Sequence, residues 1–142
     1  FVGHSMGGLV IRKFLEKNIV ENIGRCILIA TPNQGMKLSD FAEKRVKIFG
    51  KIFRPIYESA TYRLNIKRPL VETEIGVIAG NKNNLILGVL LSKESDGRVE
   101  VKETMYDGMK EFMVLNYGHK EIHYKKETVV LADNFLQNGK FN

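Results

Sequence analysis

The sequence predicts an α/β fold in which a largely parallel sheet is flanked by helices. Two apolar runs, residues 25–30 (RCILIA) and 74–79 (EIGVIA), lack polar alternation, which is typical of strands buried on both faces of a parallel sheet. Stretches with helical periodicity alternate with these runs along the chain, as expected of an α/β layer structure. With 142 residues the chain has room for one domain and not two, so residues 1–142 are predicted to form a single domain.

The first half of the chain predicts two strands around one helix. Residues 1–2 are the expected end of a strand, and a glycine-containing turn follows over residues 3–8. Residues 9–17 (LVIRKFLEK) have the pattern of a helix that ends near Asn18. The apolar run at 25–30 ends at the sequence TPNQG, which has the chemistry of a turn.

The second half predicts two more strands and a final helix. The run at 74–79 ends at a Gly-Asn step, and residues 92–98 form a polar loop with an Asp-Gly turn. Residues 99–104 alternate only weakly, whereas 112–116 (FMVLN) predict another strand. Residues 128–137 (TVVLADNFLQ) have helical periodicity and precede an Asn-Gly step, which favours the end of a helix.

The composition excludes several classes of protein. Hydrophobic residues make up 44% of the chain and charged residues 27%, which excludes disordered, collagen-like and coiled-coil chains. The one cysteine, Cys26, excludes a disulfide framework and a Cys-rich zinc site, and its place in an apolar run indicates packing. Apolar runs fall short of the ~18–20 residues of a membrane span, so we predict no transmembrane segment.

The positive charge is concentrated in residues 37–68. This segment has nine Lys/Arg against three acidic residues, which equals the net charge of +6 of the whole chain. Apolar residues at helical steps within it predict an amphipathic basic helix. This helix is either a lid or cap that meets an acidic substrate or an anionic membrane surface, or an ordinary outer helix of the fold. Because no known nucleic-acid motif accompanies this charge, we expect no nucleic-acid partner.

The sequence GHSMG at residues 3–7 carries the clearest chemical signal. A serine hydroxyl is a weak nucleophile, and Ser5 must project from a tight strand-to-helix turn to reach both a base and a carbonyl carbon. Side chains at Gly3 and Gly7 are expected to collide across that turn. The backbone N–H of Met6, at the start of the helix, would then point at a developing oxyanion.

These residues give the chain its resemblance to a known family. FVGHSMGGLV resembles the nucleophile elbow of the α/β-hydrolase superfamily, in its lipase, esterase and thioesterase-like group, and ATPNQG, EIGVIAGNKN, SDGRV and VLNYGH are similar to later segments of that fold. The resemblance covers the C-terminal part of the family's domain. It implies that the early strands and the loop with the second oxyanion N–H precede Phe1.

We therefore expect a piece of a longer protein, inactive on its own. The chain opens at Phe1 without an initiator Met, and its motif begins at Gly3. Targeting signals would also lie before Phe1, so the location stays open, with the cytoplasm slightly favoured.

The resemblance implies a catalytic triad in the chain order serine, acid, histidine. Ser5 would be the nucleophile, Asp96 the acid and His119 the base. Asp96 lies in a polar loop before Gly97, where an Asp-Gly turn alone is the alternative explanation. Two other acids, Glu94 and Asp107, lack a matching context.

Three histidines compete for the role of base. His4 lies inside the elbow, where the family usually has a packing residue, and His119 follows a predicted strand as the family's base does. His123 is the alternative base, because a spacing of four residues can place it on one helical face with His119. A metal site at this pair is disfavoured, since no glutamate base or third ligand accompanies it.

The expected activity is hydrolysis of a carboxylic ester, including lipid esters, through an acyl-enzyme intermediate. A thioesterase or acyltransferase, and a noncatalytic or partner-dependent relative of the fold, are the alternatives. The sequence contains no phosphate loop, dinucleotide fingerprint or metal cluster, so we predict no cofactor.

Overall fold

A parallel sheet lies at the centre of the computed structural model, which describes residues 1–35, 69–84 and 94–142. Within these residues the strands are β1 (Val2–His4), β2 (Cys26–Ile29), β3 (Ile75–Gly80) and β4 (Glu111–Leu115). They lie in the order β1-β2-β3-β4, and every neighbouring pair is parallel. The predicted α/β fold is confirmed.

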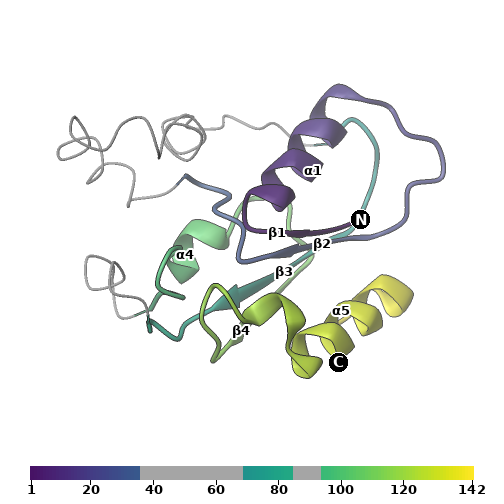
Figure 1. Cartoon of the computed structure of the whole chain (residues 1–142). Coiled ribbons are helices and arrows are strands. Elements are labelled where there is room, and N and C mark those ends of the chain that lie inside the picture. Colours follow the sequence, from purple (N-terminus) through teal and green to yellow (C-terminus); the bar gives the residue numbers. More distant parts are fainter. Residues whose placement is uncertain (36–68, 85–93) are drawn as a thin grey trace, which may run out of the picture.

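Helices cover both faces of this sheet (Figure 1). On one face α1 (Met6–Lys17) packs its Leu15 against Cys26 and Leu28 of β2. On the other face α5 (Lys126–Asn138) packs against Ile27 and Ile29 of the same strand. Successive side chains of a strand point to opposite faces, so an unbroken apolar run supplies both cores, as the sequence pattern predicted.

The ends of the helices differ in part from the sequence prediction. α5 ends at Gly139, whose φ of 75° is left-handed, as the Asn-Gly step predicted. α1 ends at Asn18 in an extended conformation, and the Asn18 side-chain amide donates to the Phe14 carbonyl at 2.8 Å. The weak alternation at residues 99–104 is no strand: a short helix, α4 (Val101–Thr104), forms there because Glu100 and Glu103 make a capping box.

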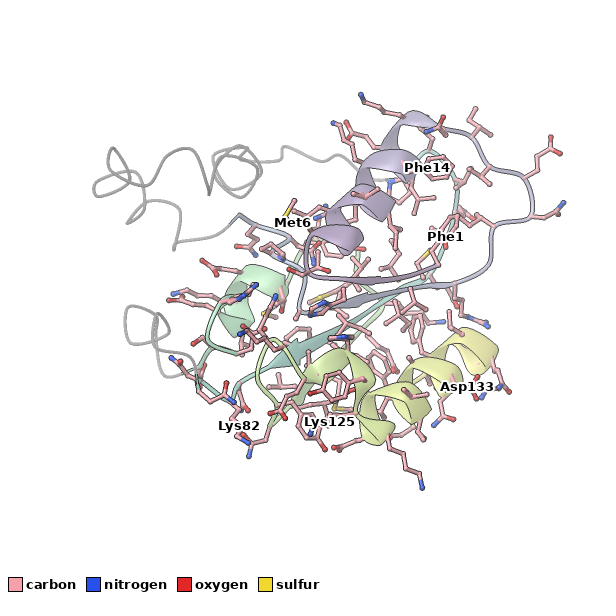
Figure 2. The ribbon with its side chains drawn as sticks, in the orientation of Figure 1. Phe1, Met6, Phe14, Lys82, Lys125 and Asp133 are labelled. Atoms are coloured by element: carbon pink, nitrogen blue, oxygen red, sulfur yellow. The ribbon has the colours of Figure 1, made fainter. Side chains whose placement is uncertain are left out.

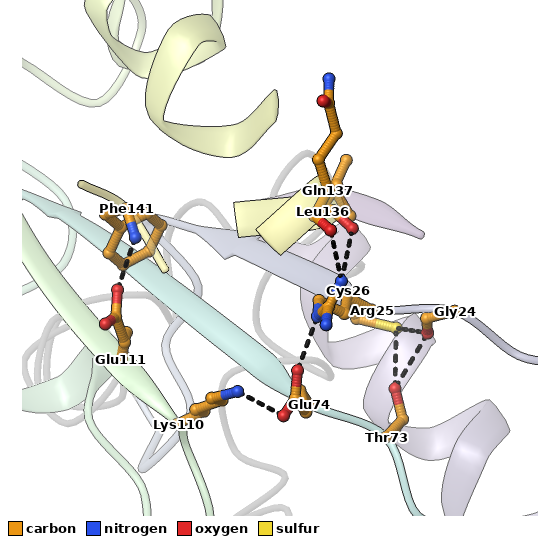
Figure 3. A network of polar contacts seen from close by, with 10 residues as sticks. All are labelled: Gly24, Arg25, Cys26, Thr73, Glu74, Lys110, Glu111, Leu136, Gln137 and Phe141. Atoms are coloured by element: carbon orange, nitrogen blue, oxygen red, sulfur yellow. Dashed lines mark hydrogen bonds and ion pairs between the residues drawn. The ribbon is translucent and has the colours of Figure 1, made fainter. Parts of the chain in front are cut away.

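The amino ends of the strands are held by a surface network of charges (Figure 3). The Arg25 guanidinium donates to Glu74 at 2.6 Å and to the carbonyl oxygens of Leu136 and Gln137. Lys110 binds the other oxygen of Glu74, and the hydrogen bonds from Lys110 and Arg25 lower the pKa of the Glu74 carboxyl. Cys26 is buried beside this network, in agreement with a packing role.

The strand β1 has β2 as its neighbour in the described part of the sheet and lies at an edge. Beside it the rings of Phe1 and Phe14 meet edge to face, with centroids 6.0 Å apart (Figure 2).

The predicted basic helix in residues 37–68, with its lid or cap and membrane roles, lies outside the described residues. Among the helices that are described, none has the length and apolarity to span a membrane.

Candidate active site

The three residues of the expected triad lie at the carboxyl edge of the sheet. Ser5 directly follows β1, Asp96 lies in the segment between β3 and β4, and His119 follows β4. Parallel strands present their carboxyl ends at one edge, and ligand sites of open α/β sheets gather there. The topology therefore brings together side chains that are far apart in the sequence.

Ser5 occupies a strained turn between β1 and α1. Its φ of 54° and ψ of −125° are unusual for a residue with a side chain. Its N–H donates to the Ile29 carbonyl of β2 at 2.8 Å, and its own carbonyl accepts from the Gly8 N–H at 3.2 Å. Such a turn is what a strand-to-helix elbow requires to expose a serine hydroxyl.

One of the two glycines of this turn has the predicted role and the other does not. A Cβ on Gly3 would lie 2.7 Å from the Gly8 nitrogen and 2.8 Å from the Gly7 carbonyl carbon, so the collision expected at Gly3 is found. A Cβ on Gly7 would meet nothing within 4 Å, and the collision expected there is wrong. A Cβ on Gly8 would instead lie 2.7 Å from Cγ2 of Thr31. The close approach of α1 to the turn after β2 therefore needs Gly8.

A chain of hydrogen bonds joins the three side chains. His119 Nε2 lies 3.0 Å from Ser5 Oγ, and His119 Nδ1 lies 2.7 Å from Asp96 Oδ2. A carboxylate can only accept, so Nδ1–H donates to Asp96 and Nε2 is left to accept from the serine hydroxyl. Asp96 is 1% exposed and His119 3%, so this pair is shielded from water, while Ser5 is only partly buried.

The second oxygen of Asp96 is also held. Asp96 Oδ1 accepts from the backbone N–H groups of Arg98 at 2.9 Å and Val99 at 2.8 Å. Gly97 between them has a φ of 92°, which a glycine adopts readily. Asp96 thus forms the predicted turn and contacts His119 at once, so the two explanations of this residue are compatible. Glu94 and Asp107, the alternative acids, both have exposed side chains.

His123 does not share a helical face with His119. It lies in a 3-10 helix, η2 (Ile122–Tyr124), and its exposed ring stacks on that of His4 at 4.4 Å between centroids. The His4 ring also contacts the His119 ring, at 4.8 Å and 43°. The ring nitrogen that lies within hydrogen-bond distance of the Ser5 hydroxyl is Nε2 of His119, and not a nitrogen of His123.

The environment of His4 keeps its ring neutral. Burial, followed by the charges of His119 and His123, lowers the pKa of His4 from 6.5 to about 4, although its hydrogen bond to the His119 carbonyl acts in the opposite direction. The unfolded chain therefore takes up a proton before the folded chain does as the pH falls below 6.5. Stability is lost between pH 6.5 and about pH 4, and this loss is complete below the folded-state pKa.

Met6, which is labelled in Figure 2, is the first residue of α1 and directly follows Ser5 in the sequence. Its side chain is 41% exposed, so the amino end of this helix lies at the surface of the described residues. The amino end of a helix carries partial positive charge and favours an anion nearby.

No group of three or more metal-ligating side chains gathers anywhere in residues 1–35, 69–84 and 94–142.

A buried arginine that the sequence analysis missed supports the elbow helix. Arg12 of α1 donates to the carbonyl and side-chain oxygens of Asn33 at 3.2 and 3.0 Å, and its guanidinium lies 4.0 Å from the Tyr106 ring centroid. Asn33 in turn donates to the Thr104 carbonyl of α4 at 2.5 Å. These contacts tie α1 to the TPNQG turn and to α4. Arg12 lies within an amphipathic helical pattern, which predicts an exposed cation there.

Comparison with known proteins supports the fold and does not identify a family. No protein-family model and no curated protein sequence matches the chain. Among solved structures, the mature form of the lipase BlEst2 from Bacillus licheniformis is similar, with a TM-score of 0.63 and 20% identity over 98% of this chain and 64% of that one. Its propeptide form gives a TM-score of 0.61 and 23% identity over 83% of this chain and 31% of that one.

The chain therefore spans less than two thirds of the length of the structures that it resembles. At these identities the likeness concerns the fold alone. The chain has an α/β fold like that of this lipase, a mostly parallel sheet flanked by helices.

Proposed function

We propose that this protein is a serine ester hydrolase that works through an acyl-enzyme intermediate. The observation that supports this most strongly is the hydrogen-bond chain from Ser5 Oγ through His119 to Asp96, with contacts of 3.0 and 2.7 Å. Nucleophile, base and orienting acid in hydrogen-bond reach of one another are the geometric signature of this chemistry. The strained backbone at Ser5 agrees with such a role, because strain concentrates at functional sites.

In the proposed first half-reaction, Ser5 Oγ attacks the carbonyl carbon of the ester while His119 Nε2 takes the hydroxyl proton. Asp96 holds Nδ1–H and stabilises the imidazolium that forms. His119 then gives the proton to the departing alcohol oxygen, which leaves the acyl group on Ser5. A water molecule then attacks that acyl carbon while His119 takes one of its protons. His119 returns this proton to Ser5 Oγ as the acyl–oxygen bond breaks, which releases the carboxylic acid and restores the Ser5 hydroxyl.

The negative charge on the carbonyl oxygen needs hydrogen-bond donors during both half-reactions. We assign one of them to the backbone N–H of Met6, because Met6 follows the nucleophile and begins α1. The partial positive charge at the amino end of α1 acts in the same direction.

The buried charge of Asp96 is compatible with this role. A buried carboxylate is costly unless donors satisfy it. Asp96 has the N–H groups of Arg98 and Val99 on one oxygen and the His119 ring on the other. The two backbone bonds fix the carboxylate before any substrate arrives, so no reorganisation is needed when His119 becomes charged.

A small-molecule acyl ester is the proposed substrate, and a lipid ester is included because the similar structures are of a lipase. The test uses protein expressed from its complete reading frame and p-nitrophenyl esters of increasing chain length. We expect a burst of p-nitrophenol equal to the enzyme concentration, followed by steady turnover, as an acyl-enzyme requires.

The matched variants are Ser5→Ala and Ser95→Ala. Ser95 is buried, and its hydroxyl has no hydrogen-bond partner within the described residues. We expect Ser5→Ala to lose about 10³-fold or more in kcat and Ser95→Ala to change it less than about threefold. A folded wild-type protein without hydrolysis of any ester in the series, or full activity in Ser5→Ala, would overturn the proposal.

A further inference from the structure

His4 makes the contact that joins the elbow strand to the backbone of the histidine loop. Its Nε2 lies 3.0 Å from the carbonyl oxygen of His119, across a sequence separation of 115 residues. Because a carbonyl can only accept, Nε2 carries a proton and donates it to this bond. His4 is also the residue immediately before Ser5. Two neighbouring residues therefore contact His119: His4 at its backbone carbonyl and Ser5 at its ring nitrogen Nε2.

The contacts of His119 show what this bond adds. The His119 N–H donates to the Asp96 carbonyl at 2.9 Å, and its ring is held between Asp96 and Ser5. The carbonyl of His119 is held by His4. Both backbone polar groups of His119 therefore have partners, one from the acid loop and one from the strand that carries Ser5.

The ring of His4 has a second contact with the same residue. It lies against the ring of His119 at 4.8 Å, and its other ring contact is with His123 at 4.4 Å and 30°. The titratable groups that act on His4 are thus His119 and Asp96 from the two loops and His123 from η2. The environment favours an uncharged ring, and an uncharged ring does not oppose the positive charge that His119 gains when it takes the serine proton.

We infer that His4 is a positioning residue for His119: its ring donates a hydrogen bond to the His119 carbonyl and thereby fixes His119 Nε2 against Ser5 Oγ. This inference rests on the proposed hydrolase function. His4 does not touch the reacting atoms and transfers no proton. Its effect is on the geometry of the base, and misplacement of a catalytic group by about 1 Å can reduce a rate by about 100-fold.

The test compares His4→Phe with His4→Gln in protein from the complete reading frame. Phenylalanine keeps a ring against His119 and removes the donor, whereas glutamine keeps an N–H donor and removes the ring. A core variant on the other side of the sheet, Val77→Ala, serves as the control for lost stability, since Val77 is fully buried in the cluster below α1. For each protein we would measure kcat and KM with a p-nitrophenyl ester, the rate of labelling by a small fluorophosphonate, and Tm.

We expect His4→Phe to lower kcat and the labelling rate together by about 30- to 100-fold, with KM changed by less than about threefold. His4→Gln is expected to restore both rates to within about tenfold of wild type. Val77→Ala should lower Tm and leave kcat within about threefold of wild type.

Other results would overturn the inference. Wild-type rates in His4→Phe would show that the bond has no effect on the base. Rates that follow Tm in every variant, Val77→Ala included, would assign His4 a purely structural role. Failure of the proposed function is recognised separately, because in that case the wild-type protein itself takes up no fluorophosphonate at Ser5.

Discussion

Replacing Asp96 with asparagine exchanges one oxygen for an NH₂ group and reverses the polarity of one hydrogen bond. Asparagine keeps an oxygen for the backbone N–H groups of Arg98 and Val99, which bind Oδ1 in the structure. Its NH₂ group then faces His119 Nδ1, where Oδ2 lies at 2.7 Å. Because NH₂ can only donate, His119 must present a lone pair at Nδ1 and carry its proton on Nε2.

The size of the effect follows from that tautomer. With a proton on Nε2, His119 cannot accept the hydrogen of the Ser5 hydroxyl, 3.0 Å away. The same exchange in a serine protease triad lowers kcat by about 10⁴-fold with the geometry intact. We expect a loss of about 10³- to 10⁴-fold in kcat, which is about 4–5.5 kcal/mol of transition-state stabilisation.

Stability should change much less than activity in this variant. Asp96→Asn keeps the two backbone bonds at Oδ1, so its free energy of unfolding should fall by no more than about 1–2 kcal/mol. Asp96→Ala loses these bonds as well, and each contributes about 0.5–1.5 kcal/mol. The assay is steady-state ester hydrolysis together with urea unfolding of both variants.

Two exposed acids provide the matched controls. Asp107→Asn and Glu94→Gln make the same chemical change at the alternative acids, and we expect kcat within about threefold of wild type in each. A folded Asp96→Asn protein that keeps more than about one tenth of wild-type kcat would refute the reasoning. A large loss in Asp107→Asn or Glu94→Gln would assign the acid role elsewhere.

Three further predictions concern the turn, the base and the response to acid. Gly3→Ala should lower the free energy of unfolding by about 1–3 kcal/mol, because its methyl group meets backbone atoms. Gly7→Ala should be neutral or stabilising by up to about 1 kcal/mol, and chemical denaturation measures both variants. His119→Gln should reduce kcat by about 10³-fold or more and His123→Gln by less than about threefold, and the reverse order would make His123 the base. As the pH falls from 6.5 to 4, the protein should lose about 1–2 kcal/mol of stability through His4, less than the full pKa shift implies because the ring is half-exposed. If denaturation curves show that His4→Gln keeps this loss, the loss does not come from His4.

The strands and the elbow could be predicted because their causes are local. Unbroken apolar runs indicate strands with two covered faces, and β2 and β3 are buried along their whole length. The tight turn at Ser5 was predicted from glycines two residues away on each side of a serine, between a strand and a helix. Asp96 and His119 followed from the resemblance and from the order of residues along the chain.

The remaining features depend on contacts between distant segments. Which glycine of the elbow is needed depends on how α1 is rotated against Thr31, and a helix turns by about 100° per residue, so Gly7 and Gly8 face different surroundings. The contact of His4 with His119 joins residues 115 positions apart in the sequence and has no local pattern. The burial of Arg12 depends on α4, where a capping box prevailed over weak strand alternation.

Covalent labelling of the serine is the most direct test of the central proposal. Protein from the complete reading frame would be treated with a fluorophosphonate and digested, and the adduct located by mass spectrometry, with Ser5→Ala treated in parallel. We predict one adduct, on Ser5, that forms more slowly in Asp96→Asn and is absent from Ser5→Ala. A folded protein that takes up no label, or takes it up on another residue, would contradict the assignment of Ser5 as the nucleophile.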